Sequence, residues 1–548
     1  MRFPGFAISA SLLLATAASA AQPTFSADRF KAHVAFLADD SLEGRDTGSR
    51  GHEVAAAYVA SQFLGLGLRP AGTDGGWYQQ VPLRSAMLEG VPSLTISGPG
   101  GSKSWSNGSE FVARPSLTEQ AQDVSAPVVF VGYGIDDEAA GPSDYAGLDV
   151  RGKIVAVLGG MPEGLPSEIS AHLGSQKEAV AARHGAIGVV TVPTAQYARV
   201  RPFAQMRDYG GRPVMQWLGP DGRVLDEAPG VRATALLNDP AASLLFAGAP
   251  RSFAQVEAEA ARPQARPKGF ALATTVRLKR RSSWTRITSP EVIGLLPGND
   301  PKLAGEYVVL MGHLDHLGIK RDAKPGDDRI YNGALDNAAG VATMLEAARA
   351  FVESGERPRR SILFIANTGE EKGLLGADYF ANHPTVPIAS IASVVDLDMP
   401  LLLYDFTDVI AFGADHYTLA RTVARAAGKM DLKMSPDPMP EQSIFTRSDH
   451  YQFVRQGVPA VFLATGFANG GAEKWAQFLN GAYHHVQDDM SQPINWEAGA
   501  RFAKLNYLIS RDLADADQRP LWYQGDYFGN LFAAKAKRAD RPAGAAAN

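Results

Sequence analysis

Five short stretches of the sequence hold the His, Asp and Glu residues that could do chemistry. They are Gly312 to His316, Gly333 to Ala338, Thr368 to Glu371, Asp398, and Tyr483 to Asp489. The 548 residues include no cysteine, so any metal site has to be built from imidazoles and carboxylates. Zinc accepts both ligand types, and a catalytic zinc site keeps one position open for water. The sequence therefore predicts a catalytic metal site.

Asp336 is the candidate for a bridging ligand. Two neighbouring ions need a shared anion because their mutual repulsion has to be offset, and a carboxylate can bridge them with its two oxygens. In His313-Leu314-Asp315 the carboxylate lies two residues after the imidazole. We expect the Asp315 carboxylate to accept the other ring N–H of His313 and so to fix its tautomer.

Glu370 and Glu371 can divide the work at one strand end. We expect Glu371 to bind metal, while Glu370 stays unligated and accepts a proton from the attacking water. The residue types alone leave an exchange of these roles open. They also leave two structural explanations open: Asp336 as the N-cap of the next helix, and the glutamate pair as acidic residues at a helix start.

In this order and spacing, the stretches resemble the co-catalytic di-zinc exopeptidase family, which includes bacterial secreted aminopeptidases and glutamate carboxypeptidase II. The resemblance rests on H-x-D-H at His313, A-L-D-N-A-A-G at Ala334, N-T-G-E-E at Asn367, L-D-M at Leu397, S-D-H-Y at Ser448 and Y-H-H-V-Q-D-D at Tyr483. L-E-G-R-D-T-G-S at Leu42 also resembles the start of these catalytic domains, so the match extends over most of the chain.

The resemblance implies two zinc ions and a set of protein ligands. One ion takes His313, Glu371 and Asp336. The other takes Asp336, Asp398 and His484. The resemblance also implies that Glu370 is the general base and that a cis peptide bond follows Asp336.

The last ligand histidine has two candidates. Many relatives have proline two residues after this histidine, where the present chain has Val486. This departure leaves His485 as the alternative to His484. Alignment on Tyr483 and Asp488 favours His484.

Apolar runs alternate with helical segments in the second half of the chain. The clearest strands are Tyr307 to Met311, Ser361 to Ala366, Ser393 to Leu397 and Pro459 to Ala464, and a helix over Ala338 to Glu353 separates the first two. This alternation predicts an α/β fold with a largely parallel sheet covered on both faces. With the resemblance, it predicts a three-layer α/β/α zinc-exopeptidase fold around a mostly parallel mixed sheet. Ligands bind at the carboxyl ends of such strands, where the polar stretches lie.

The domain organisation is predicted to be discontinuous. A signal peptide of residues 1–20 precedes a first part of the peptidase domain at 21–118. Residues 119–269 have their own short strands and a Pro/Arg-rich exit, and they resemble the smaller, β-rich protease-associated insert of this family. The peptidase domain resumes at 270–532, and a flexible tail is expected at 533–548.

The net charge of this chain does not indicate any class of binding partner. A net charge of -5, from 53 basic and 58 acidic residues, provides no field for nucleic acid and no polybasic segment for a membrane surface. The signal peptide predicts export to the periplasm or the medium, without stable membrane insertion. The sequence predicts no oligomeric state.

The predicted function is that of a zinc aminopeptidase acting on peptides. The alternatives on the same fold are a carboxypeptidase or amidase, a glutaminyl cyclase that uses a single metal, and a non-catalytic receptor-like protein. All five proposed ligands and Glu370 are present, which counts against the last alternative.

Overall fold

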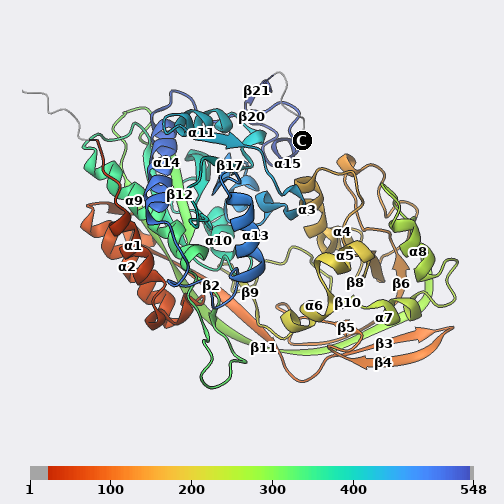
Figure 1. The fold of residues 1–548 in the computed structure, drawn as a ribbon. Coiled ribbons are helices and arrows are strands. Elements are labelled where there is room, and N and C mark those ends of the chain that lie inside the picture. Colours follow the sequence, from red (N-terminus) through yellow and green to blue (C-terminus); the bar gives the residue numbers. More distant parts are fainter. Residues whose placement is uncertain (1–21, 543–548) are drawn as a thin grey trace, which may run out of the picture.

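The computed structural model describes residues 22–542, which form two lobes that share one long strand (Figure 1). The predicted signal peptide at residues 1–20 lies outside the described residues. The first lobe contains the central sheet and most of the helices. It carries all of the predicted site residues.

Four adjacent parallel strands form the middle of the central sheet. Their order is β15 (Ser361–Asn367), β12 (Tyr307–His313), β16 (Ile391–Asp396) and β19 (Ala460–Thr465). These strands are buried along nearly their whole length, as expected for a sheet covered on both faces. Each predicted strand is thus present, with ends that differ by at most two residues from the prediction.

Other strands extend the central sheet on both sides. They are β1 (Arg69–Pro70), β2 (Tyr78–Leu88), β9 (Val214–Trp217) and the second part of β11 (Phe270–Leu296) beside β15, and β17 (Asp408–Phe412) and β18 (Lys433–Ser435) beside β19. Several of these pair antiparallel, so the sheet is mixed with a parallel centre.

Two groups of helices cover this sheet. The first consists of α1 (Ala27–Leu37), α2 (Arg50–Gly65), α9 (Ala339–Glu353), α11 (Leu419–Gly428) and α14 (Trp496–Asp515). The second consists of α10 (Leu375–Asn382) and α12 (His450–Val454), which pack on each other and on the sheet. Alanine and glycine recur along α9 and allow it to lie close to the strands, so that nearly all of its side chains are buried. The predicted α/β fold around a mostly parallel mixed sheet is confirmed.

A second sheet forms the other lobe. Its strands are β3 (Ser93–Gly98), β4 (Gly101–Ser106), β5 (Phe111–Val112), β6 (Ala121–Phe130), β7 (Ile154–Leu158), β8 (Gly188–Val192), β10 (Ala233–Leu237) and the first part of β11. Its helices are α3 (Ser167–Ser175), α4 (Lys177–Arg183), α5 (Ala195–Val200), α6 (Phe203–Gly210), α7 (Asp239–Leu245) and α8 (Phe253–Ala260). We call residues 93–281, apart from β9, the insert lobe. This range is wider than the predicted 119–269 because strands on both sides of that range join this sheet.

β11 belongs to both lobes. Its first part pairs with β6 and β3 of the insert lobe up to Arg281, and its second part pairs with β2 from Ser282 and with β15 from Val292. Figure 1 shows it running along the base of both lobes. The chain therefore returns from the insert lobe along a continuous strand, and the predicted exit at residue 269 lies just before this strand begins.

Helix α3 also joins the insert lobe to the first lobe. Glu168 Oε2 lies 2.8 Å from His416 Nε2, and Asp526 Oδ2 lies 2.7 Å from the Nδ1 of the same ring. One turn further along α3, His172 Nδ1 lies 2.8 Å from the hydroxyl of Tyr451 on α12. The buried imidazoles of His416 and His172 thus attach α3 to the first lobe.

The remaining elements lie around the first lobe. They are α13 (Gly471–Gly481), α15 (Tyr527–Phe532), the pair β13 (Gly318–Ile319) and β14 (Ile330–Tyr331), and the pair β20 (Trp522–Tyr523) and β21 (Arg538–Ala539). β21 falls within the range predicted as a flexible tail, so part of that range is folded against β20. No helix within residues 22–542 is both long and apolar enough to span a membrane.

Candidate metal centre

Three neighbouring parallel strands deliver ligand groups to one edge of the central sheet. β12 ends at His313, β15 is followed by Glu370 and Glu371, and β16 is followed by Asp398. These strands lie side by side in the order β15, β12, β16, so their carboxyl ends converge. The predicted ligand groups therefore lie together at this edge of the sheet.

Asp336 comes from the turn before α9. The helix begins at Ala339, its N-cap position is Ala338, and no side chain caps it. The capping explanation for Asp336 is therefore wrong. The peptide bond between Asp336 and Asn337 is cis, as the resemblance implied.

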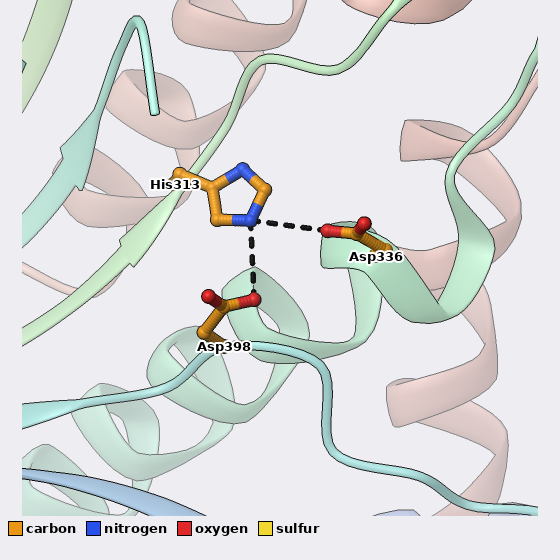
Figure 2. A group of neighbouring side chains, drawn as sticks. All are labelled: His313, Asp336 and Asp398. Carbon is orange, nitrogen blue, oxygen red and sulfur yellow. Dashed lines mark hydrogen bonds and ion pairs between the residues drawn. The ribbon is translucent and has the colours of Figure 1, made fainter. Parts of the chain in front are cut away.

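The two oxygens of Asp336 face two different histidines. Oδ1 lies 3.2 Å from His313 Nε2, and Oδ2 lies 3.2 Å from His484 Nε2. His313 Nε2 is also 3.2 Å from Asp398 Oδ1 (Figure 2). His484 Nε2 is 3.4 Å from Glu371 Oε2. Asp336 thus stands between two groups of ligands, in the position of a bridge.

This arrangement corrects the expected division of ligands. His313 was expected to share an ion with Glu371, and His484 with Asp398. The distances instead place His313 with Asp398 and His484 with Glu371, and Asp336 is common to both groups. The sequence could not decide this division, because it depends on which loops face each other across the sheet edge.

His484 is the histidine that faces the site. Its side chain is 33% exposed and its backbone φ is 58°, which turns the ring back toward Asp336. His485 is exposed, and its Nδ1 lies 2.8 Å from the backbone oxygen of Tyr483. Tyr483 stacks on the His484 ring with centroids 3.8 Å apart. Between the two candidates, the geometry favours His484.

Glu370 lies next to the ligand groups and makes no ion pair with a Lys or Arg within residues 22–542. α10 begins only at Leu375, so Glu370 and Glu371 do not belong to the first turn of a helix. Burial raises the pKa of Glu370 well above its ordinary value, and the nearby carboxylates of Glu371 and Asp398 raise it further against the effect of His313. A carboxylate with high proton affinity beside the site can act as a base there.

Asp315 supports the site through a different contact from the predicted one. The Nδ1 of His313 lies 3.0 Å from the backbone oxygen of Asp315, so the main chain fixes the tautomer and the predicted carboxylate contact is wrong. The Asp315 carboxylate instead accepts the Thr47 hydroxyl at 2.8 Å and the Glu370 backbone N–H at 3.2 Å. Asp315 therefore positions the glutamate pair rather than the histidine.

Arg45 connects two of the metal loops. Its buried guanidinium donates to the backbone oxygens of Leu314 at 2.9 Å, Asn332 at 2.6 Å and Gly333 at 3.2 Å, and also to that of Leu37. The Arg45 guanidinium thus donates hydrogen bonds to both the loop that carries His313 and the loop that carries Asp336. Sequence reasoning noted this stretch only through the resemblance, because no local pattern indicates that an arginine will be buried.

Ser448 performs a similar function for Asp398. Its hydroxyl lies 2.7 Å from Asp398 Oδ2 and 2.8 Å from Asp396 Oδ2. Asp396 also accepts the backbone N–H of His450 at 3.2 Å. Asp396 therefore supports this loop through hydrogen bonds. Ser448 had been identified only as part of a motif.

The donor set fits zinc. One imidazole and two carboxylates surround one position, and the other position has Asp336, Glu371 and His484. Within residues 22–542, no Lys or Arg pairs with Asp336, Glu371 or Asp398. Such a concentration of buried carboxylates is costly without a cation. Ligand atoms that share a tetrahedral zinc with bonds of about 2.0–2.1 Å lie roughly 3.3 Å apart, close to the N···O separations found here.

The chain is similar in sequence to known peptidases. Residues 291–509 match peptidase family M28. A probable zinc metalloprotease of Pyrenophora tritici-repentis is 36% identical over 262 residues, which cover 42% of this chain and 58% of that protein. Probable leucine aminopeptidase 2 of Aspergillus fumigatus is 27% identical over 245 residues, which cover 41% of this chain and 45% of that protein. The chain thus spans less than two thirds of the length of these curated relatives.

A solved structure shares the fold over nearly the whole chain. The aminopeptidase from Aneurinibacillus sp. strain AM-1 has a TM-score of 0.52 and 21% identity, and the match covers 92% of this chain and 97% of that one. The likeness includes both lobes, although at this identity it indicates fold alone. The sequence match and the ligand motifs together identify residues 291–509 as a peptidase domain of family M28, and the resemblance to co-catalytic zinc exopeptidases is confirmed.

Proposed function

We propose that this protein is a zinc-dependent aminopeptidase that removes N-terminal residues from peptides, with two ions in the site and Glu370 as general base. The observation that carries the proposal is the double contact of Asp336, whose two oxygens each lie 3.2 Å from a different histidine. A carboxylate in this position is suited to bridge two cations. The names of the matched relatives, which include a leucine aminopeptidase, support the exopeptidase assignment.

The ligand assignment follows the distances. His313, Asp336 and Asp398 hold one ion, and Asp336, Glu371 and His484 hold the other. When bound, paired zinc ions polarise the scissile carbonyl and lower the pKa of water. The ion position formed by His313, Asp336 and Asp398 has no fourth ligand among the described residues. This leaves room there for water and substrate.

Glu370 is suited to move the proton. Its backbone N–H is held by Asp315, so the carboxylate stays beside Glu371 without needing a metal to place it. It accepts a proton from the attacking water and donates it to the leaving amine. The Asp315 carboxylate, fixed by Thr47, is a positioning group for this step.

The insert lobe and the export signal complete the proposal. We assign the insert lobe as a protease-associated domain that limits access to the site, and residues 1–20 as a signal peptide that directs export. Deleting part of a lobe that shares β11 would unfold the protein, so access is better tested by comparing dipeptide and oligopeptide turnover in variants of α3.

Substrates with free and blocked N-termini test the reaction. We expect hydrolysis of aminoacyl-p-nitroanilides and of unblocked peptides, and no hydrolysis of the same peptides after N-acetylation. Release of a C-terminal residue from N-acetylated peptides would instead establish a carboxypeptidase. Conversion of N-terminal glutamine to pyroglutamate, with one bound ion, would establish a cyclase.

A further inference from the structure

His316 is the third histidine of the metal centre, and the ligand motifs leave it without a role. Its side chain is fully buried, at 0% exposure. Neither of its ring nitrogens makes a directed hydrogen bond to any group within residues 22–542. A buried neutral imidazole has one donor and one acceptor to satisfy, and native proteins rarely leave both unpaired. Apart from its contact with Glu371, the ring therefore has no polar partner among the described residues.

The ring lies beside the position assigned to the second ion. His316 Nδ1 is 2.7 Å from Glu371 Oε1, whereas His484 contacts the other oxygen, Oε2. One donor atom each from His316, Asp336 and Glu371 lies within 4.8 Å of the other two. The rings of His316 and His484 meet edge to face, with centroids 6.0 Å apart and an interplanar angle of 67°. Glu371 is thus flanked by two imidazoles.

The backbone holds this ring in place. A Cβ atom on Gly333 would lie 2.7 Å from the Cγ and Cδ2 atoms of His316, so the ring packs against the bare glycine backbone. The backbone N–H of His316 donates to the oxygen of Arg45 at 3.2 Å. The position of the imidazole is therefore set by the fold before any ion binds, as a ligand site requires.

We propose that His316 is an additional protein ligand, through Nδ1, of the ion held by Asp336, Glu371 and His484. The proposal rests on the proposed two-ion site. The second ion then has two imidazoles and two carboxylates, and the ion at His313 has one imidazole and two carboxylates. Four protein ligands fill a tetrahedral zinc site, so this position is closed, while the position at His313 keeps room for water and substrate.

The two positions should therefore differ in how tightly they hold metal. The ion at His316 is expected to be retained when the ion at His313 is removed by a chelator. A competing explanation is that His316 only donates an N–H to Glu371 and positions it. His316→Asn separates the two, because its amide nitrogen can donate a hydrogen bond from near the Nδ1 position but is a poor metal ligand.

The experiment uses the full chain, stripped of metal and dialysed against buffers of fixed free Zn²⁺. Metal content is measured by mass spectrometry, and Co²⁺ titration reports the coordination through its visible absorption. We expect the wild type to bind two zinc ions with different affinities, a tighter and a weaker class. His316→Ala and His316→Asn should both weaken the tighter class by at least about 10-fold, in the range of 10–100-fold known for groups that support metal sites, and should alter the Co²⁺ spectrum.

The control is His485→Asn, which changes an exposed neighbouring histidine and should leave both classes unchanged. Circular dichroism and the melting temperature check folding, and the asparagine variant keeps the test decisive if the alanine variant misfolds. A His316→Asn protein with wild-type zinc affinity and Co²⁺ spectrum would overturn the proposal. Failure of the proposed function would look different: the wild type would hold fewer than two ions, or hold two and hydrolyse no peptide.

Discussion

The carboxylate of Asp488 holds the backbone of Asp336 in place. Its Oδ2 accepts the backbone N–H of Asp336 at 2.9 Å, and its Oδ1 accepts that of Leu335 at 2.9 Å. Asp488 lies four residues after His484 in the chain, so one loop supplies a ligand and the support for the bridging ligand.

Asp488→Asn should weaken metal binding without removing a ligand. The amide can accept one of the two backbone N–H groups but presents its own N–H₂ to the other, so the turn at Asp336 loses a partner. We expect metal affinity to fall by about 10–100-fold, as for other groups that support ligands. Dialysis against buffered Zn²⁺ measures this, with Asp489→Asn as the neighbouring control. Equal affinities in the two variants would show that the turn needs no such support.

Glu370→Gln should separate proton transfer from metal binding. The amide cannot accept a proton, so we expect turnover to fall by about 10²–10⁴-fold while both ions are retained. Glu371→Gln is the matched variant at the next residue and should lose one ion as well as activity. Metal analysis and peptidase assays on both proteins measure the outcome. The reverse pattern would exchange the roles of the two glutamates.

Arg45→Lys should loosen the two loops that carry His313 and Asp336. An ammonium cannot reach the four backbone oxygens that the guanidinium contacts, and a charged buried donor contributes about 1.5–3 kcal/mol per hydrogen bond. We expect the free energy of unfolding to fall by about 3 kcal/mol or more. Urea unfolding measures this loss. Arg50→Lys, at an arginine that is 81% exposed, is the control and should change stability little.

His416→Gln should make stability less dependent on pH. Burial alone would lower the pKa of His416, but Glu168 and Asp526 raise it to about 10. The pKa is raised on folding, so the stabilisation is fully present below about 6.5, the unfolded value, and is lost as the pH rises through about 10. The difference in unfolding free energy between wild type and variant should therefore be largest near pH 6, on the order of a few kcal/mol, and should shrink toward pH 10.

Urea unfolding of both proteins at several pH values tests this dependence. Comparing the two proteins isolates His416, because the carboxylates of the metal centre titrate equally in both. A difference that stays constant between pH 6 and pH 10 would contradict a charged His416 between the two lobes.

The sequence predicted the central strands and the residues at their ends well. Long apolar runs such as Ser361 to Ala366 can only be buried, and the polar groups after them fall at one sheet edge because parallel strands share a direction. Motif order identified His313, Asp336, Glu371, Asp398 and His484, which the structure brings together.

The contacts between distant loops were not predictable in the same way. The division of ligands between two positions, the backbone contact of His313, and the burial of Arg45 all depend on how loops approach in space. The extent of the insert lobe was also not predictable, because the sequences of β3 and β4 do not indicate which of the two sheets these strands join. His316 lay in the first motif, but spacing alone gave no reason to treat it as more than a neighbour.

The shared strand β11 has a consequence for how the two lobes move. A pair of domains joined by flexible linkers can rotate freely, whereas here any rotation has to bend or twist a backbone ladder that is hydrogen-bonded along both halves. Relative rotation of the lobes is therefore restricted to small flexing about this strand, and β9 and α3 are further points of attachment.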